Sequence, residues 1–159
     1  MSDVHLLADG SSYGLGIGSD GVLIGGRGTT LAGLALQART SSALINRAFL
    51  DRSGGFSVGI SAGSPQIENG VLAASSVSAT DMRMYADGSQ TGLQTGDRGT
   101  LTTGSTQPVL VFAFNANGGA VAFSGARLRC YSIGYGLSGS GVSSFTTAIQ
   151  RFNTALSRT

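Results

Sequence analysis

The sequence predicts a mainly β protein, an antiparallel β-sandwich with a single amphipathic helix at the C-terminal end. Glycine makes up 26 of the 159 residues, and Asp-Gly or Asn-Gly pairs recur between short apolar runs, with turns expected for example at Asp9-Gly10 and Asp87-Gly88. Such pairs are the strongest short-range signal of a hairpin. After Gly136 the apolar spacing changes to three and four residues, which is the period of a helix. A mass of 16.0 kDa suits one domain, so we expect residues 1–159 to form a single β-sandwich domain.

The strand-length runs follow one another along most of the chain. Expected strands cover residues 4–8, 13–18, 22–26, 34–38, 43–50, 56–61, 82–86, 108–116 and 126–134. Several alternate in polarity, as where Met82 and Met84 alternate with Arg83 and Tyr85. Residues 108–114 are nearly all apolar, which favours a central strand that is covered on both faces. About nine short strands at such spacing are typical of a two-sheet antiparallel sandwich.

The last expected element is a helix over about residues 139–157. Its apolar stripe consists of Val142, Phe145, Ile149, Phe152 and Leu156. We expect the helix to dock on a sheet and bury Phe145, Ile149 and Phe152. Ser138 or Ser140 can cap its start. Arg151 and Arg158 suit the negative end of its dipole.

Composition excludes several classes of function. All ten basic residues are arginine, so no lysine is present for a Schiff base or a phosphate-binding P-loop. The arginines form no dense stripe, which argues against a nucleic-acid partner. No apolar stretch is long enough for insertion into a membrane, and the first residues lack the pattern of a signal peptide. Only 11% of residues are charged, which favours packing between copies of the chain in a homo-oligomer.

Catalytic and metal-binding motifs receive little support. The stretch from Gly16 to Gly21 matches G-x-G-x-x-G, but a strand is expected after it instead of a helix. Three G-x-S-x-G matches all follow His5, the only histidine, whereas the nucleophile elbow needs a later one. Glu68 is the only glutamate, and no pair of acids suitable for glycoside hydrolysis is visible. Aspartates in loops could hold Ca²⁺, but their spacing gives no support, so we expect no metal or other cofactor.

The C-terminal segment resembles a known family. From Asn115 to Leu156 the chain reads NANGGAVAFSGARLRCYSIGYGLSGSGVSSFTTAIQRFNTAL. It has a polar Asn-Gly turn, a strand ending in Tyr-Ser-Ile-Gly, a Leu-Ser pair and an amphipathic helix. This order is similar to the end of concanavalin A-like (laminin G-like) domains in structural proteins of tailed phages and prophages. The upstream segments MRMYADGSQTG and QARTSSALINRAFLDRSGG resemble further hairpins of such domains.

Two positions depart from the pattern of that family. Residues 139–141 are Gly-Ser-Gly where the first turn of the helix often carries an acidic residue or glutamine. Cys130 stands where an aromatic or aliphatic residue is common. Neither departure affects the expected fold, and both make the kinship within the family loose.

The resemblance implies a concanavalin-like jelly roll on a tail fibre, spike or other virion part, made in the cytoplasm of a host bacterium. Such a domain attaches to cell-surface carbohydrate through loops at one rim. Its partners would be a host glycan, other virion structural proteins and copies of itself, for example in a trimer. Candidate sugar contacts are polar or aromatic residues in expected turns: Tyr13, Asp87, Asn115, Asn117 and Tyr135.

Two alternatives remain open. The first is a purely structural decoration or assembly module without a ligand. The second and weakest is a glycan-cleaving enzyme on the same scaffold, and we expect no enzymatic activity.

Overall fold

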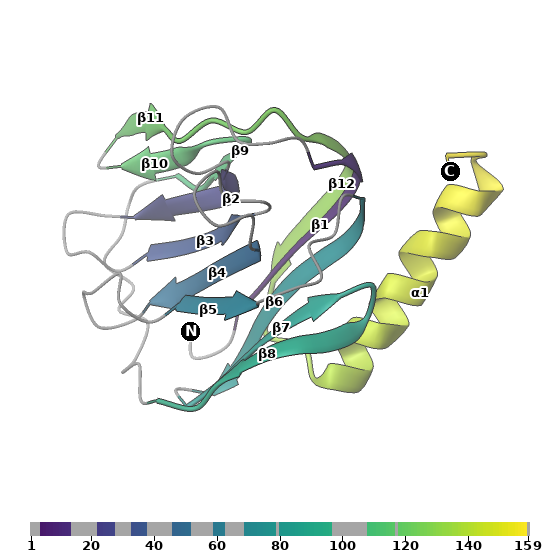
Figure 1. Ribbon diagram of the computed structural model, residues 1–159, viewed down its shortest axis with the longest axis horizontal. Helices are drawn as coiled ribbons and strands as arrows, with labels where there is room; N and C mark the ends of the chain where they lie inside the picture. Colours follow the sequence, from purple (N-terminus) through teal and green to yellow (C-terminus); the bar gives the residue numbers. More distant parts are fainter. Residues whose placement is uncertain are drawn as a thin grey trace.

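The computed structural model consists of two β-sheets that pack face to face, with one helix on the outer side of the first sheet (Figure 1). It describes residues 4–13, 22–27, 33–37, 46–51, 59–62, 69–78, 80–96, 108–116 and 118–158. The predicted β-sandwich with a C-terminal helix is therefore confirmed. No helix among these residues is long and apolar enough to cross a membrane.

The first sheet has five strands in the order β12-β1-β6-β7-β8, and all its pairs are antiparallel. Its strands are β1 (Val4–Ser12), β6 (Gly70–Ser78), β7 (Asp81–Ala86), β8 (Ser89–Gln94) and β12 (Arg127–Gly134). The expected Asp87-Gly88 turn joins β7 to β8, with positive φ angles of 48° and 79°. The expected turn at Asp9-Gly10 is wrong, because β1 continues to Ser12 and only its register shifts there.

The second sheet has seven strands and contains a parallel pair. Its strands are β2 (Val22–Arg27), β3 (Gly33–Gln37), β4 (Asn46–Asp51), β5 (Gly59–Ala62), β9 (Leu110–Val111), β10 (Phe114–Ala116) and β11 (Gly119–Val121). The order is β11-β10-β2-β3-β4-β5, with β9 also paired to β2. β10 runs parallel to β2, whereas the sequence predicted antiparallel pairs throughout.

The prediction of one continuous central strand over residues 108–116 is wrong. Phe112 has a φ of +65° and is exposed, so the chain turns there. β9 pairs antiparallel with β2 before this turn, and β10 pairs parallel with β2 after it. The apolar run therefore supplies two short strands to the same neighbour.

Two apolar layers hold the fold together. Between the sheets, side chains of β1, β6 and β7 meet those of β2, β3 and β4; the largest fully buried ones are Tyr13, Leu6, Ile24, Leu36, Leu72, Met82 and Met84. On the outer face of the first sheet, α1 (Gly139–Ala155) packs on Leu7, Val71, Ala73 and Tyr85 through Val142 and Ile149. Removing such side chains from water is the main stabilising contribution in a domain of this size.

The helix is rotated relative to the expected stripe. Its buried residues are Val142, Thr146, Ile149 and Asn153, while Phe145 is half-buried and Phe152 is 58% exposed. The expectation that Phe152 is buried is therefore wrong, because Asn153 faces the sheet in its place. Ser138 caps the helix as predicted, accepting a hydrogen bond from the Gly141 N–H. No basic residue lies in the last turn, and Arg158 follows the end of the helix.

A buried polar cluster fixes the C-terminal half of α1. Asp9 is 1% exposed and receives two hydrogen bonds from Arg129, at 3.0 and 2.9 Å. Asn153 Nδ2 donates to the same carboxylate at 2.6 Å. The hydrogen bonds that Arg129 donates to Asp9 are the main reason that the pKa of Arg129 is raised. The cluster thus joins β1, β12 and α1.

Candidate functional site

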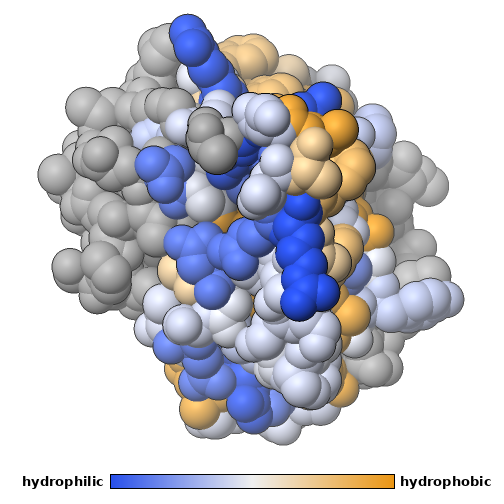
Figure 2. Space-filling view, turned by 90° about the vertical axis from the view of Figure 1, so that its right-hand side faces the viewer, coloured by the Kyte–Doolittle hydropathy of each residue, from blue (hydrophilic) through white to orange (hydrophobic). Residues whose placement is uncertain are grey.

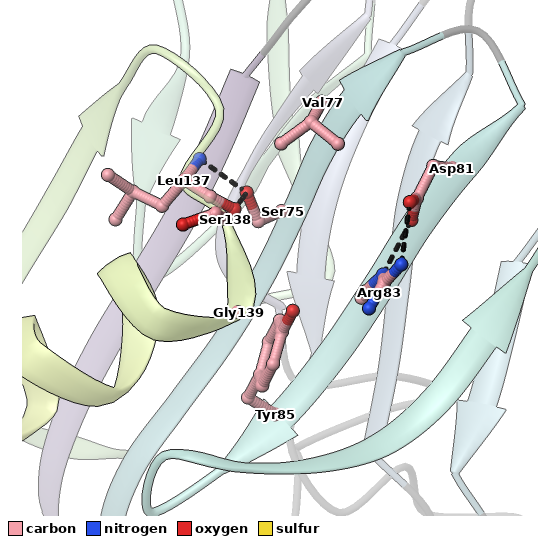
Figure 3. A pocket seen from close by; sticks show the side chains of 8 residues that line it. All are labelled: Ser75, Val77, Asp81, Arg83, Tyr85, Leu137, Ser138 and Gly139. Atoms are coloured by element: carbon pink, nitrogen blue, oxygen red, sulfur yellow. Dashed lines mark hydrogen bonds and ion pairs between the residues drawn. The ribbon is translucent and has the colours of Figure 1, made fainter.

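A hollow of about 190 Å³ opens at the N-terminal end of α1, on the outer face of the first sheet (Figure 3). Two strands and the connection from β12 to α1 form its walls. The lining residues are Ser75 and Val77 from β6, Asp81, Arg83 and Tyr85 from β7, and Leu137, Ser138 and Gly139 from the start of the helix. Residues of β7 point to one face at every second position, so Asp81, Arg83 and Tyr85 share this side.

Ser75 ties the helix connection to the sheet. The Leu137 N–H donates to Ser75 Oγ at 2.7 Å, and the same hydroxyl donates to the Leu137 carbonyl at 2.8 Å. Ser75 is buried, so these hydrogen bonds are shielded from water. They hold the connection just before α1 beside β6, where both line the hollow.

Asp81 and Arg83 form a two-point ion pair along one wall. Arg83 Nε and Nη2 donate to the two carboxylate oxygens of Asp81, each at 2.8 Å. Arg83 Nη1 also donates to Gln90 Oε1 at 3.2 Å. The side chains are 39% and 25% exposed for Arg83 and Asp81, respectively. The hydrogen bonds that Arg83 donates to Asp81 raise the pKa of Arg83, so the guanidinium stays charged. The pair offers donors from Arg83 and acceptors from Asp81 to the hollow.

Tyr85 places a hydroxyl at the inner end of the hollow. The residue is 3% exposed, and among the described residues its Oη has no hydrogen-bond partner. Burial raises the pKa of the phenol, and the nearby charge of Arg83 lowers it by a smaller amount. Arg83 is not within hydrogen-bond geometry of the hydroxyl. The hydroxyl is therefore protonated and can donate. An unpartnered buried hydroxyl costs about 1–3 kcal/mol, so this one calls for an explanation.

The positive end of the helix dipole lies at the same place. The first N–H groups of a helix have no partner within the helix. The first turn of α1 carries no acidic side chain that would balance the partial positive charge. Gly139 has no side chain to cover the hollow, and a Cβ built there would lie 3.4 Å from Tyr85 Oη.

The structure contradicts two of the predicted sugar contacts. Tyr13 is 1% exposed, and its hydroxyl donates to the carbonyls of Ala8 and Gly70 at 2.9 and 2.7 Å. Its ring lies against Gly10, where a Cβ would come within 2.5 Å. Asn115 is also buried; its Nδ2 donates to the Pro108 carbonyl and its Oδ1 accepts from the Gly118 N–H. Both side chains are buried and hydrogen-bonded to backbone groups, so neither is placed to contact a sugar.

The other three predicted contacts differ in their positions. Asp87 is exposed, but its Oδ1 accepts a hydrogen bond from the Val71 N–H at 2.8 Å and so ties the β7–β8 turn to β6. Asn117 lies outside the described residues. Tyr135 is 72% exposed in the connection between β12 and α1, two residues before Leu137 of the hollow. The structure therefore does not bring the predicted set together.

Sequence reasoning missed the residues that line the hollow. The alternation in residues 81–86 places Asp81, Arg83 and Tyr85 on the face opposite Met82 and Met84. That signal was readable, but the sequence did not show that the helix start covers this face. It also did not predict β6, the central strand of the first sheet, which supplies the opposite wall.

His5 and Cys130 have structural positions. The Nδ1 of His5 lies 2.6 Å from the Tyr135 carbonyl and its Nε2 lies 2.9 Å from Ser132 Oγ. Since a carbonyl only accepts, Nδ1 donates to it, whereas the serine hydroxyl can serve either as donor or as acceptor to Nε2. Cys130 is half-buried, and burial raises the pKa of its thiol. Within the described part of the chain, no three His, Cys, Asp or Glu side chains are grouped as metal ligands would be.

Comparisons with known proteins identify the fold. No family model and no curated protein matches the sequence. The solved structure of the Ruminococcus gnavus IT-sialidase CBM40 matches with a TM-score of 0.64 at 13% identity, over 91% of this chain and 82% of that one. The same module bound to α2,3-sialyllactose matches with a TM-score of 0.62 at 12% identity, with the same coverage. Neither structure comes from a phage.

A longer sialidase contains a similar fold as one of its parts. A Trypanosoma rangeli sialidase matches with a TM-score of 0.57 at 17% identity over 94% of this chain. The match spans 23% of that sialidase chain. At such identities the likeness shows a shared β-sandwich fold, in agreement with the sheets and helix described above.

Proposed function

We propose that this protein is a carbohydrate-binding β-sandwich module that attaches to cell-surface glycan. The observation that carries the proposal is the hollow beside α1. There a charged pair and a hydroxyl that has no partner among the described residues face the same small space. Sugar recognition uses such groups, because each hydroxyl of a sugar donates and accepts hydrogen bonds. The shared fold with a module that binds sialyllactose supports the proposal.

The hollow offers both kinds of contact that a sugar ring requires. Asp81 accepts and Arg83 donates, while Val77 and Leu137 supply apolar surface for the C–H groups of the ring. A volume of about 190 Å³ is below the roughly 300–1,000 Å³ of sites for drug-sized ligands, which suits one sugar ring. The exposed Tyr135 nearby gives an aromatic face for a neighbouring sugar.

Binding without cleavage agrees with the composition of the hollow. Glycoside hydrolysis normally requires two carboxyl groups on either side of the bond that breaks. Of the eight residues that line the hollow, Asp81 alone carries a carboxylate, and that carboxylate is paired with Arg83. Release of reducing ends from host polysaccharide would overturn the proposal of a non-catalytic module.

The test is binding to a glycan array followed by calorimetry on the strongest ligand. Arg83→Ala should weaken binding by about ten-fold, because the ligand loses a charged donor. Arg151→Ala removes the same charge from an exposed position on α1 and serves as the matched control. Equal binding by the two variants would show that the hollow is not the sugar site.

The position of the module on a virion is a further part of the proposal. It rests on the resemblance of residues 115–156 to domains of tailed-phage structural proteins. Host bacteria would then carry the glycan, and many weak sites on one particle would act together through avidity. Mass spectrometry of purified particles should find this chain among tail proteins, and its absence from them would refute this part.

Exposed apolar side chains favour a structural role as the second candidate. Tyr131 and Ile133 lie on the edge strand β12, and both are exposed, as are Phe152 and Leu156 at the end of the helix. Figure 2 shows apolar atoms exposed on the helix side of the molecule. Such positions suit contacts between copies or with other virion proteins. Light scattering should find a trimer or another oligomer if this role holds, and a monomer would contradict it.

A further inference from the structure

We propose that the hollow binds the carboxylate of an acidic sugar, held between the N-terminal end of α1 and the Tyr85 hydroxyl. This proposal rests on the proposed carbohydrate-binding function and names the class of sugar. Three features of the site carry it: free helix N–H groups, a buried donor without a partner, and a neighbouring pair that is neutral overall.

The helix end provides the charge. Hydrogen bonds within the described residues use the N–H groups of Gly141 and Val142, both directed to Ser138. They leave the N–H groups of Gly139 and Ser140 free to donate. A helix of 17 residues concentrates about half a positive charge at this end, which attracts an anion.

Tyr85 provides an independent indication of a ligand. Its hydroxyl lies at the inner end of the hollow and points toward the start of the helix, as Figure 3 shows. Because its raised pKa keeps it protonated, it can donate to a carboxylate oxygen. A Cβ built at Gly139 would lie 3.4 Å from this hydroxyl, so the glycine leaves room for a ligand atom beside it.

The Asp81–Arg83 pair sets the orientation of the ligand. The charges of the pair cancel, so the pair does not attract an anion strongly. The Asp81 carboxylate also repels an anion that comes close to it. A carboxylate is therefore favoured at the helix end, with the hydroxyl groups of the ring turned toward the pair. Asp81 then accepts from those hydroxyl groups, and the remaining N–H groups of Arg83 donate to them.

The direct test compares sugars that differ only in the charge of one group. Calorimetry is performed with galacturonic acid and its methyl ester, and with 3′-sialyllactose and the methyl ester of its carboxyl group. The free acid of at least one pair should bind about ten-fold more tightly than its neutral counterpart. Equal binding of acid and neutral forms would overturn this inference while the carbohydrate-binding function stands. Absence of binding to any glycan of the array would overturn both.

Two substitutions locate the carboxylate. Gly139→Ala places a methyl group 3.4 Å from Tyr85 Oη, a distance of ordinary contact, so the fold is kept and the approach is covered. Tyr85→Phe removes the donor. Both variants should bind the acid about ten-fold more weakly and bind the neutral sugar unchanged. Arg151→Ala is the control, since it changes the net charge away from the hollow.

A third arm separates a sugar carboxylate from a free anion. Inorganic phosphate is added as a competitor at a concentration ten times the Kd that calorimetry gives for the acidic sugar. We expect it to leave the affinity for the acidic sugar nearly unchanged, because the ring contacts Val77 and the charged pair as well. Full displacement by phosphate would show a general anion site and overturn the inference.

Discussion

The two ends of α1 rest on the same face of the same sheet, but their polar contacts differ. At the C-terminal half, Asp9 is buried, yet Arg129 and Asn153 satisfy both its oxygens. Arg129 also donates to the carbonyls of Gly10 and Arg158, at 3.1 and 3.2 Å. At the N-terminal end, Tyr85 keeps a buried hydroxyl without a partner among the described residues.

This difference separates a polar cluster that supports the fold from one that is suited to a ligand. A completely paired cluster joins elements and has no donor left to offer. A cluster with an unpaired buried group lowers stability, so its presence in a native protein indicates a role other than supporting the fold. Thr146 Oγ1, about two turns further along the helix, also has no partner in the described part of the chain, but it does not line the hollow. The comparison predicts opposite responses to mutation at the two ends.

The largest effect is expected at the C-terminal half. Asp9→Ala leaves Arg129 without its charge partner in a place where the Asp9 side chain is 1% exposed. Breaking a buried ion pair from one side costs about 3–5 kcal/mol of unfolding free energy. Urea unfolding followed by circular dichroism measures it. Asp81→Ala is the matched control on the partly exposed pair, and an equal loss in both variants would contradict the comparison.

Tyr13→Phe is expected to have the next largest effect. The variant leaves the carbonyls of Ala8 and Gly70 without the hydroxyl that now binds both. A loss of about 1–3 kcal/mol in unfolding free energy follows. Sugar binding should be unchanged, because the side chain lies between the sheets. Weaker glycan binding at unchanged stability would restore Tyr13 as a contact residue.

The two ends also differ in how far the sequence could predict them. Turn pairs and alternation were sufficient for the hairpin of β7 and β8, and spacing was sufficient for α1, because these signals are local. β6 was missed because Ala73, Ala74, Ser75 and Ser76 are small residues with weak strand preference. Its burial between β1 and β7 outweighs that preference.

The site was less predictable than the fold. Tyr13 and Asn115 read as turn residues, but partners distant in sequence bury them, as with the Tyr13 bond to Gly70. The hollow needs β7 and the start of α1 side by side, and Tyr85 and Gly139 are far apart in sequence. Position in a turn was therefore a poor guide to exposure, because exposure depends on tertiary contacts.

Ser138→Ala is expected to have a moderate effect at the N-terminal end. It removes the side chain that accepts from the Gly141 N–H at 3.1 Å. Loss of a cap of this type costs about 1 kcal/mol. Thermal unfolding measures it, with Ser144→Ala at an exposed position of the same helix as the control. If both variants unfold at the temperature of the parent, the cap does not determine where α1 begins.

Tyr85→Phe is expected to change stability least, and in the direction opposite to Asp9→Ala. The substitution keeps the ring, which packs on Val142 and Ile149, and removes only a hydroxyl without a partner. Since that hydroxyl contributes no bond within the described chain, the melting temperature should stay the same or rise. Acidic-sugar binding should fall in the same variant. A clear drop in melting temperature would show that the hydroxyl supports the fold, and the contrast between the two ends of the helix would then no longer hold.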